Sequence, residues 1–163
     1  MTIDFSKLNF TFSKKPLIIG GMAMEHYGLR KSGADIDLVA CKEDIEKLVK
    51  KYPQNLKNLW GDFGIAIYDF EIWKTVRYFD YDYLKEDAIE RENYLIISLD
   101  KLLLQKAVAM EEEKYLNDLK LIVKKIQSNQ SEKSEQIKSE NQSILSKVDN
   151  VEYVEYVEKI GEN

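Results

Sequence analysis

The order of apolar and polar residues predicts a domain in which short strands alternate with helices. Apolar runs of strand length occupy residues 17–19 and 94–97. Residues 35–39 alternate between acidic and apolar side chains, a pattern typical of a strand with two unlike faces. Residues 42–51 carry apolar side chains at helical spacing, and Pro53 follows them. This combination predicts a helix that ends just before the proline.

Three further segments complete the predicted order. Residues 22–29 follow a Gly-Gly pair and are expected to form a short helix. Residues 65–76 are rich in β-branched and aromatic side chains, which predicts one strand or two. Residues 78–92 mix aromatic and acidic side chains and fit no single period. The order of elements predicts an α+β fold with a small mixed sheet flanked by helices, and with further helices at the C-terminal end.

A long helical pattern follows the last predicted strand. Ser98 is suited to cap a helix N-terminus, and apolar residues recur at helical spacing over residues 99–110 and 116–126. Between these stretches, residues 111–114 read Glu-Glu-Glu-Lys and interrupt the apolar stripe. We therefore expect two helices with a break between them, and we expect Asn117 to cap the second helix.

A change in composition divides the chain near residue 127. Residues 128–163 open with nine consecutive polar residues and carry 4 Lys against 8 acidic residues. We expect residues 1–127 to form the folded domain, and residues 128–163 to form a polar linker, or an exposed helix, and an acidic amphipathic tail. Apolar residues recur at helical spacing from Val151 to Ile160. They predict a surface for self-association or for a protein partner.

Composition narrows the functional class. The 163 residues are 44% hydrophobic and 33% charged, which is enough apolar material for the core of one domain. The net charge of −5 argues against a protein that coats nucleic acid. One Cys and one His exclude an internal disulfide and metal sites built from several such residues. No apolar run reaches the roughly 18 residues of a membrane helix, so we expect a cytoplasmic protein without membrane contact.

Candidate chemistry is concentrated in residues 17–39. Gly20 and Gly21 lie between a predicted strand and a predicted helix, where missing side chains let a ligand approach backbone N–H groups. This arrangement is suited to binding a phosphate group. Asp35 and Asp37 are two positions apart on the next strand, so both carboxylates leave one face and can share a divalent cation. Without a cation, the two carboxylates would repel each other.

This segment resembles the signature of the polymerase-beta-type nucleotidyltransferase superfamily. In that family an apolar residue, Gly and then Gly or Ser precede a spaced Asp-x-Asp, as residues 19–21 and 35–38 do in this chain. The residues between them resemble the abortive-infection and toxin-type branch, which includes minimal nucleotidyltransferases of bacterial toxin–antitoxin systems. The resemblance extends over residues 16–126 and does not include the tail.

The resemblance implies an enzyme that uses Mg²⁺ or Mn²⁺ to move a nucleotidyl group from an NTP to an acceptor. The acceptor is left open among RNA, a protein hydroxyl and a small molecule. For Arg30, pairing with Asp35 is the alternative to binding phosphate. The resemblance assigns metal binding to Asp35 and Asp37, and nucleotide binding to Gly20, Gly21, Arg30 and Ser32.

Three more functional residues are inferred from the resemblance. A third carboxylate in the family comes from a neighbouring strand and acts as metal ligand or base. Asp69 is the first choice, and Glu71 and Asp62 are the alternatives. A Lys and a later Asp of the toxin-type branch are matched by Lys106 and Asp118. In one straight helix these two would lie ~18 Å apart, so a shared site requires the predicted break.

A second functional hypothesis belongs to a different class. The fold could be a catalytically inactive nucleotidyltransferase that serves as a binding or regulatory module in a toxin–antitoxin or phage-defence system. The open choice of third acid and the acidic composition favour this module, whereas the intact Gly-Gly and Asp-x-Asp motifs favour the enzyme. The aromatic residues between 73 and 83 are interpreted as core or interface residues rather than as a surface that stacks a base.

Overall fold

The structure, a computed structural model, describes residues 3–148, so the stripe predicted from Val151 to Ile160 lies outside the described residues. The chain divides into a first unit that ends at Lys125 and a second that begins at Ile126. Within the described range, no helix is both long and apolar enough to cross a membrane.

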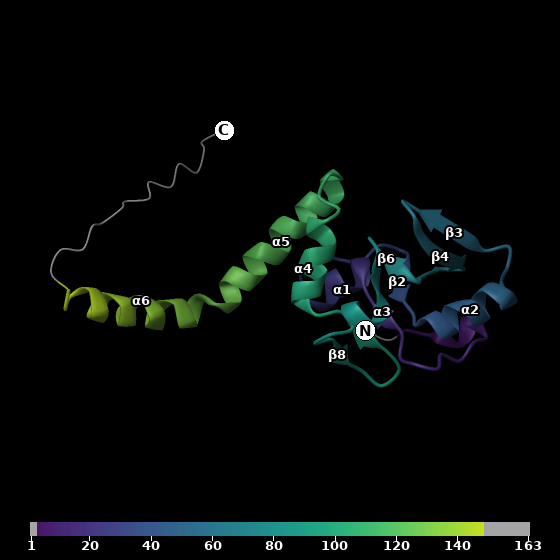
Figure 1. The fold of residues 1–163 in the computed structure, drawn as a ribbon, viewed down its shortest axis with the longest axis horizontal. Helices are drawn as coiled ribbons and strands as arrows, with labels where there is room; N and C mark the ends of the chain where they lie inside the picture. Colours follow the sequence, from purple (N-terminus) through teal and green to yellow (C-terminus); the bar gives the residue numbers. More distant parts are fainter. Residues whose placement is uncertain (1–2, 149–163) are drawn as a thin grey trace. The chain divides into compact units, whose positions relative to one another are not determined.

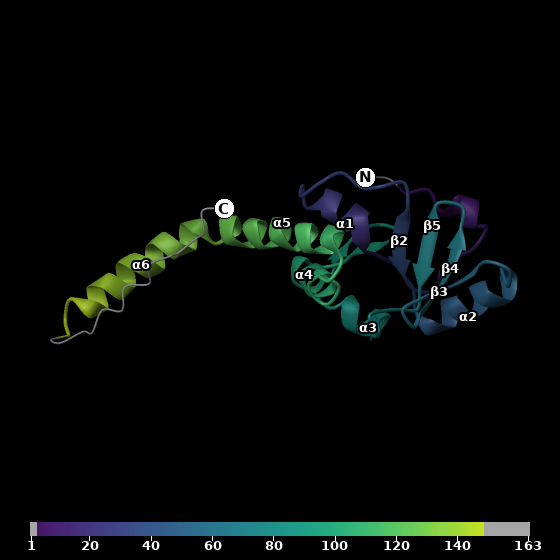
Figure 2. The same cartoon turned by 90° about the horizontal axis from the view of Figure 1, so that it is seen from above.

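The first unit is built on a mixed sheet of seven described strands, as the predicted α+β fold requires. Strand β2 is parallel to β5, and β1 is parallel to β9, whereas the other neighbours are antiparallel. Figure 2 shows β2, β5 and β4 side by side. In spatial order the strands are β3 (Leu56–Leu59), β4 (Asp62–Ile67), β5 (Phe70–Trp73), β2 (Ile36–Val39), β1 (Leu17–Ile18), β9 (Leu95–Ile96) and β8 (Ile89–Glu90).

Helices and a small second sheet connect these strands (Figure 1). Helix α2 begins and ends at the residues that the hydrophobic pattern predicts. The second sheet pairs β6 (Thr75–Val76) with β7 (Phe79–Asp80). The helices are η1 (Phe5–Leu8), α1 (Gly20–His26), α2 (Lys42–Lys51), α3 (Tyr81–Leu84), α4 (Leu99–Ala107), α5 (Glu113–Asn129) and, in the second unit, α6 (Ser131–Leu145).

The hydrophobic core is centred on the short middle strands. Leu17 and Ile18 are adjacent on β1, and both are fully buried. Leu38 and Val39 of β2 show the same pattern. Because adjacent strand residues point to opposite faces, both faces of the sheet are covered at these positions. Strand β1 therefore reads as an apolar run in the sequence, whereas β2 carries the acidic Asp37 between two apolar residues.

The structure differs from the prediction between residues 56 and 80. The segment expected to be one strand or two forms β4, β5 and β6, because Tyr68 adopts a φ of 55° and reverses the chain. Strand β3 was not predicted. Its Leu56 is exposed at the edge of the sheet, so no buried alternation marks the strand in the sequence.

The predicted break in the long helical pattern is confirmed. Helix α4 ends at Ala107, and α5 begins at Glu113. The hydroxyl of Ser98 caps α4 by accepting a hydrogen bond from the backbone N–H of Lys101. The expectation that Asn117 caps the second helix is wrong, because α5 begins earlier and includes Asn117. The early start follows from Glu113 and Lys114, which are good helix formers and belong to α5, whereas Glu111 and Glu112 lie in the break.

The composition of α6 predicts that the C-terminal segment contributes little to the stability of the first unit. The described side chains of α6 are mostly exposed and none is buried. We expect deletion of residues 131–163 to change the melting temperature by less than about 2 °C, because few apolar contacts are lost. Circular dichroism melts would measure this. A fall of ~10 °C or more would show that the tail belongs to the core.

Candidate functional site

One cavity of about 370 Å³ gathers most of the residues singled out in the sequence. Its volume is that of a small-molecule site. Residues from α1, β2, β5, α4 and α5 line it together with the loop that follows α1. Tyr115 and Lys114 of α5 contribute to the same wall as α4. The predicted residues that line this cavity are Gly20, Gly21, Arg30, Ser32, Asp35, Asp37, Asp62, Glu71 and Lys106.

A steric constraint links Gly20 to Asp37. Gly20 has a φ of 57°, a conformation that residues with a side chain rarely adopt. A Cβ atom at this position would lie 2.1 Å from Oδ2 of Asp37. The Asp37 carboxylate therefore occupies the space that a side chain would need, and the Gly-Gly turn and the Asp-x-Asp strand pack as one unit.

The Asp37 carboxylate lies in a strongly anionic environment. Asp37 is half-buried, and in the sheet register it is paired with Glu71 of the parallel strand β5. Burial and the negative charge of Glu71 raise the pKa of Asp37, whereas Lys106 and the Trp73 side chain lower it. Asp35, by contrast, is exposed at the cavity mouth. A cation in this part of the cavity would stabilise the ionised form of Asp37.

Asp69, the first choice for a third carboxylate, does not line the cavity. It lies in the turn between β4 and β5, and its Oδ2 atom is 3.6 Å from Nζ of Lys7. The segment was read as one strand or two without a turn at residue 68, and the turn at Tyr68 places Asp69 outside the cavity lining. The alternative, Glu71, stands beside Asp37, and its carboxylate pairs with Lys57.

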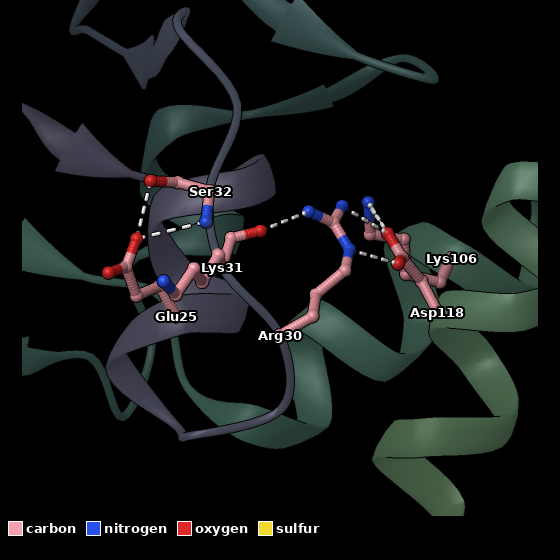
Figure 3. Close-up of polar contacts among 6 residues, drawn as sticks. All are labelled: Glu25, Arg30, Lys31, Ser32, Lys106 and Asp118. Carbon is pink, nitrogen blue, oxygen red and sulfur yellow. Dashed lines mark hydrogen bonds and ion pairs between the residues drawn. The ribbon is translucent and has the colours of Figure 1, made fainter.

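Asp118 does not itself line the cavity, but its buried carboxylate joins two cations that do, Arg30 and Lys106 (Figure 3). The Oδ1 atom of Asp118 accepts a hydrogen bond of 2.6 Å from Nε of Arg30, and Oδ2 accepts one of 2.9 Å from the same guanidinium. Nζ of Lys106 lies 2.8 Å from Oδ2. Asp118 is only 2% exposed and Lys106 only 5%. The helix break thus brings Lys106 and Asp118 together.

The pKa shifts of this network have clear causes. Burial lowers the pKa of Lys106, and the hydrogen bond to Asp118 offsets part of that effect. Burial also acts to raise the pKa of Asp118, but hydrogen bonds from Arg30 and Lys106 outweigh it and leave that pKa below its usual value. Asp118 therefore stays ionised. Arg30 uses its guanidinium on Asp118 rather than on Asp35, the partner considered from the sequence.

Ser32 is held in place by α1. Its backbone N–H and its hydroxyl both donate to the Glu25 carboxylate. Arg30 in turn donates from Nη1 to the backbone carbonyl of Lys31. These bonds, drawn in Figure 3, tie the loop after α1 to the helix that precedes it. The loop wall of the cavity is therefore braced by its own polar contacts.

Gln105 is a cavity residue that the sequence does not reveal. It is 6% exposed, and among the described side chains its Nε2 atom is buried without a hydrogen-bond partner. Gln105 precedes Lys106 on α4, and both line the cavity. A buried amide without a partner costs stability. An ordered water or a polar ligand can complete the hydrogen bonds of such a group.

Comparisons with protein-family descriptions, curated proteins and solved structures found no match for this chain. The interpretation of the function therefore depends on the geometry of the cavity.

In the described part of the chain, no group of three or more His, Cys, Asp or Glu side chains is arranged to hold a metal ion. Asp35 and Asp37 are the residues whose oxygens could bind one. Because carboxylates and cations both line it, the cavity can accommodate a polyanion together with a divalent cation.

The buried network predicts a large effect of neutralising Asp118. We expect Asp118→Asn to lower the free energy of unfolding by about 3 kcal/mol, because Lys106 and Arg30 lose their shared anion. Adding Lys106→Met to this variant should recover about 1 kcal/mol or more, since one unpaired cation is removed. Urea denaturation measures both changes.

The exposed pair of Asp82 and Lys85 supplies the control for this prediction. Asp82→Asn should cost less than about 1 kcal/mol, as is usual for surface ion pairs. A loss for Asp118→Asn no larger than that of the control would contradict the structural role assigned to the network.

For Gln105 we predict that removing the polar group does not destabilise the protein, in contrast to Asp118. We expect Gln105→Met, which keeps the side-chain volume and removes the unpaired amide, to leave the free energy of unfolding unchanged or to raise it by about 1 kcal/mol. Gln54→Met, at an exposed position, is the control. A loss of more than about 1 kcal/mol in Gln105→Met alone would mean that the amide is needed for folding rather than for a ligand.

Proposed function

We propose that this protein is a Mg²⁺-dependent nucleotidyltransferase that binds an NTP in the cavity and transfers its nucleotidyl group to an acceptor. The observation that carries the proposal is the convergence of Gly20-Gly21, the Asp35-x-Asp37 pair and Lys106 on one cavity. These three features come from separate segments of the chain. In this proposal the mixed sheet is of the nucleotidyltransferase type, and the acceptor is RNA, a protein hydroxyl or a small molecule.

The two aspartates are suited to hold the metal ion. Mg²⁺ is commonly bound by one or two carboxylates together with substrate phosphates, so a site without a third protein ligand fits its chemistry. Burial first, and the charge of Glu71 second, raise the pKa of Asp37, and a divalent cation would favour its ionised form. When bound, the ion would neutralise phosphate charge and polarise the reacting phosphoryl group.

The two cations that line the cavity, Arg30 and Lys106, are suited to hold the triphosphate. Arg30 and Lys106 share a single anion, Asp118, so the group retains one net positive charge. Asp118 is directed to the two cations and restrains both, which makes it a positioning residue. Lys106 lines the cavity as a point charge for phosphate oxygens. The absence of side chains at Gly20 and Gly21 allows the phosphates to approach the backbone.

Glu71 is the best-placed residue to accept the proton of the acceptor. In the proposed reaction an acceptor hydroxyl attacks the α-phosphorus, a new P–O bond forms, and the bond to the departing pyrophosphate breaks. The hydroxyl proton passes to a carboxylate. Glu71 lines the cavity beside Asp37, whereas Asp69 lies outside it, and the carboxylate of Asp62 is hydrogen-bonded to the chain.

One observation favours the second hypothesis, a catalytically inactive binding or regulatory module. The Glu71 carboxylate pairs with Lys57, so it is less available to an acceptor hydroxyl. A module of this kind would bind NTP through the same cavity and would not transfer the nucleotide. Binding and transfer must therefore be measured separately.

A transfer assay tests the proposal. We expect the protein to move radioactivity from α-labelled NTPs to a component of mixed cellular RNA and protein when Mg²⁺ is present. Asp37→Asn should reduce transfer at least 100-fold, because a metal ligand is lost, and calorimetry should show weaker Mg²⁺ binding. Asp82→Asn, on the exposed helix α3, is the matched control and should retain full activity.

The outcomes separate the two hypotheses. NTP binding without transfer to any acceptor would favour the regulatory module. Unchanged Mg²⁺ affinity in a variant carrying both Asp35→Asn and Asp37→Asn would contradict the metal site itself.

A further inference from the structure

Two tight turns meet at the rim of the cavity. The first, between β3 and β4, contains Trp60 and Gly61, and the second, between β6 and β7, contains Arg77 and Tyr78. All four residues have positive φ values, of 53°, 88°, 50° and 68° in that order. Left-handed backbone at a residue with a side chain costs energy and is concentrated at functional sites. Trp60 and Arg77 both line the cavity.

A buried carboxylate holds these turns together. Asp62 is 5% exposed, and its Oδ1 atom accepts hydrogen bonds from the Thr75 hydroxyl at 2.7 Å and from the Tyr78 N–H at 3.1 Å. Its Oδ2 atom accepts a bond of 2.5 Å from the N–H of Arg77. Bonds of this kind to an ionised carboxylate are among the stronger ones in proteins. The Asp62 carboxylate therefore fixes the backbone of the strained turn that contains Arg77.

The same arrangement leaves a flat pair of side chains facing outward. The guanidinium carbon of Arg77 lies 4.3 Å from the centroid of the Trp60 ring. Trp60 is 49% exposed, so the core does not account for its position. Two planar groups that contact each other at a cavity rim, with Trp60 half exposed, are suited to an aromatic ring of a ligand, which would stack on them.

We propose that the pair formed by Trp60 and Arg77 is the stacking site for the base of the nucleotide bound in this cavity. This inference rests on the proposed function, which places the phosphates near Gly20, Gly21 and Lys106. The cavity is continuous from those residues to the rim, so one nucleotide can contact both ends. Because every base has a π-face, stacking alone admits all four NTPs, and purines gain more because their rings are larger.

The test compares ATP with inorganic tripolyphosphate, which has the phosphates but no base. Both are titrated by calorimetry in the presence of Mg²⁺ against the wild-type protein and Trp60→Ala. We expect roughly ten-fold weaker ATP binding in the variant, the loss of one base–aromatic stack. The affinity for tripolyphosphate should remain unchanged. Tyr68→Ala is the control, because Tyr68 is 79% exposed, has a φ of 55° and does not line the cavity.

A second pair of variants decides the question if Trp60→Ala does not fold. Trp60→Phe retains an aromatic ring, whereas Trp60→Leu retains apolar volume without one. ATP should bind Trp60→Phe more tightly than Trp60→Leu. Equal ATP affinity in these two variants, or an equal loss for both ligands in Trp60→Ala, would overturn the stacking site and leave the proposed function standing. Failure of the wild-type protein to bind either ligand would overturn both.

Discussion

The buried ionic contact of Asp118 with Arg30 and Lys106 determines how the cavity is built. It connects α5, the end of α4 and the loop after α1, three segments far apart in the sequence. Desolvating three charged groups is costly, and apolar residues of similar size would stabilise the fold at least as well. In the proposed function, the network holds two cations at the cavity in spite of this cost.

Three carboxylates around the cavity have different surroundings. Asp118 is paired with two cations, and Asp62 is hydrogen-bonded by the strained turn that follows β6. Asp37 has neither arrangement and lies beside Glu71. Because the first two carboxylates have their partners within the chain, Asp37 is the one at which the proposed function places a cation. In that proposal a polar ligand or an ordered water completes the hydrogen bonds of Gln105.

Much of this architecture was predictable from local patterns. The boundaries of α2 and the break between α4 and α5 follow from hydrophobic spacing, which is a local property. The placement of Asp69 outside the cavity depends on the turn at Tyr68, and the sequence marks this turn only by Asp69 itself, which was interpreted as a site residue. The partner of Arg30 was also not predictable, because Asp118 is distant in sequence and becomes its neighbour only through tertiary packing. The place of Gln105 in the cavity lining was not predictable either, because it depends on which face of α4 packs toward the cavity.

A crystal structure of the protein with Mg²⁺ and a non-hydrolysable NTP would test the central claim most directly. The account predicts Mg²⁺ on the Asp35 and Asp37 carboxylates, phosphate oxygens within hydrogen-bond distance of Lys106, and an intact contact between Lys106 and Asp118. A nucleotide bound elsewhere on the protein, with the cavity empty at saturating ligand, would contradict it.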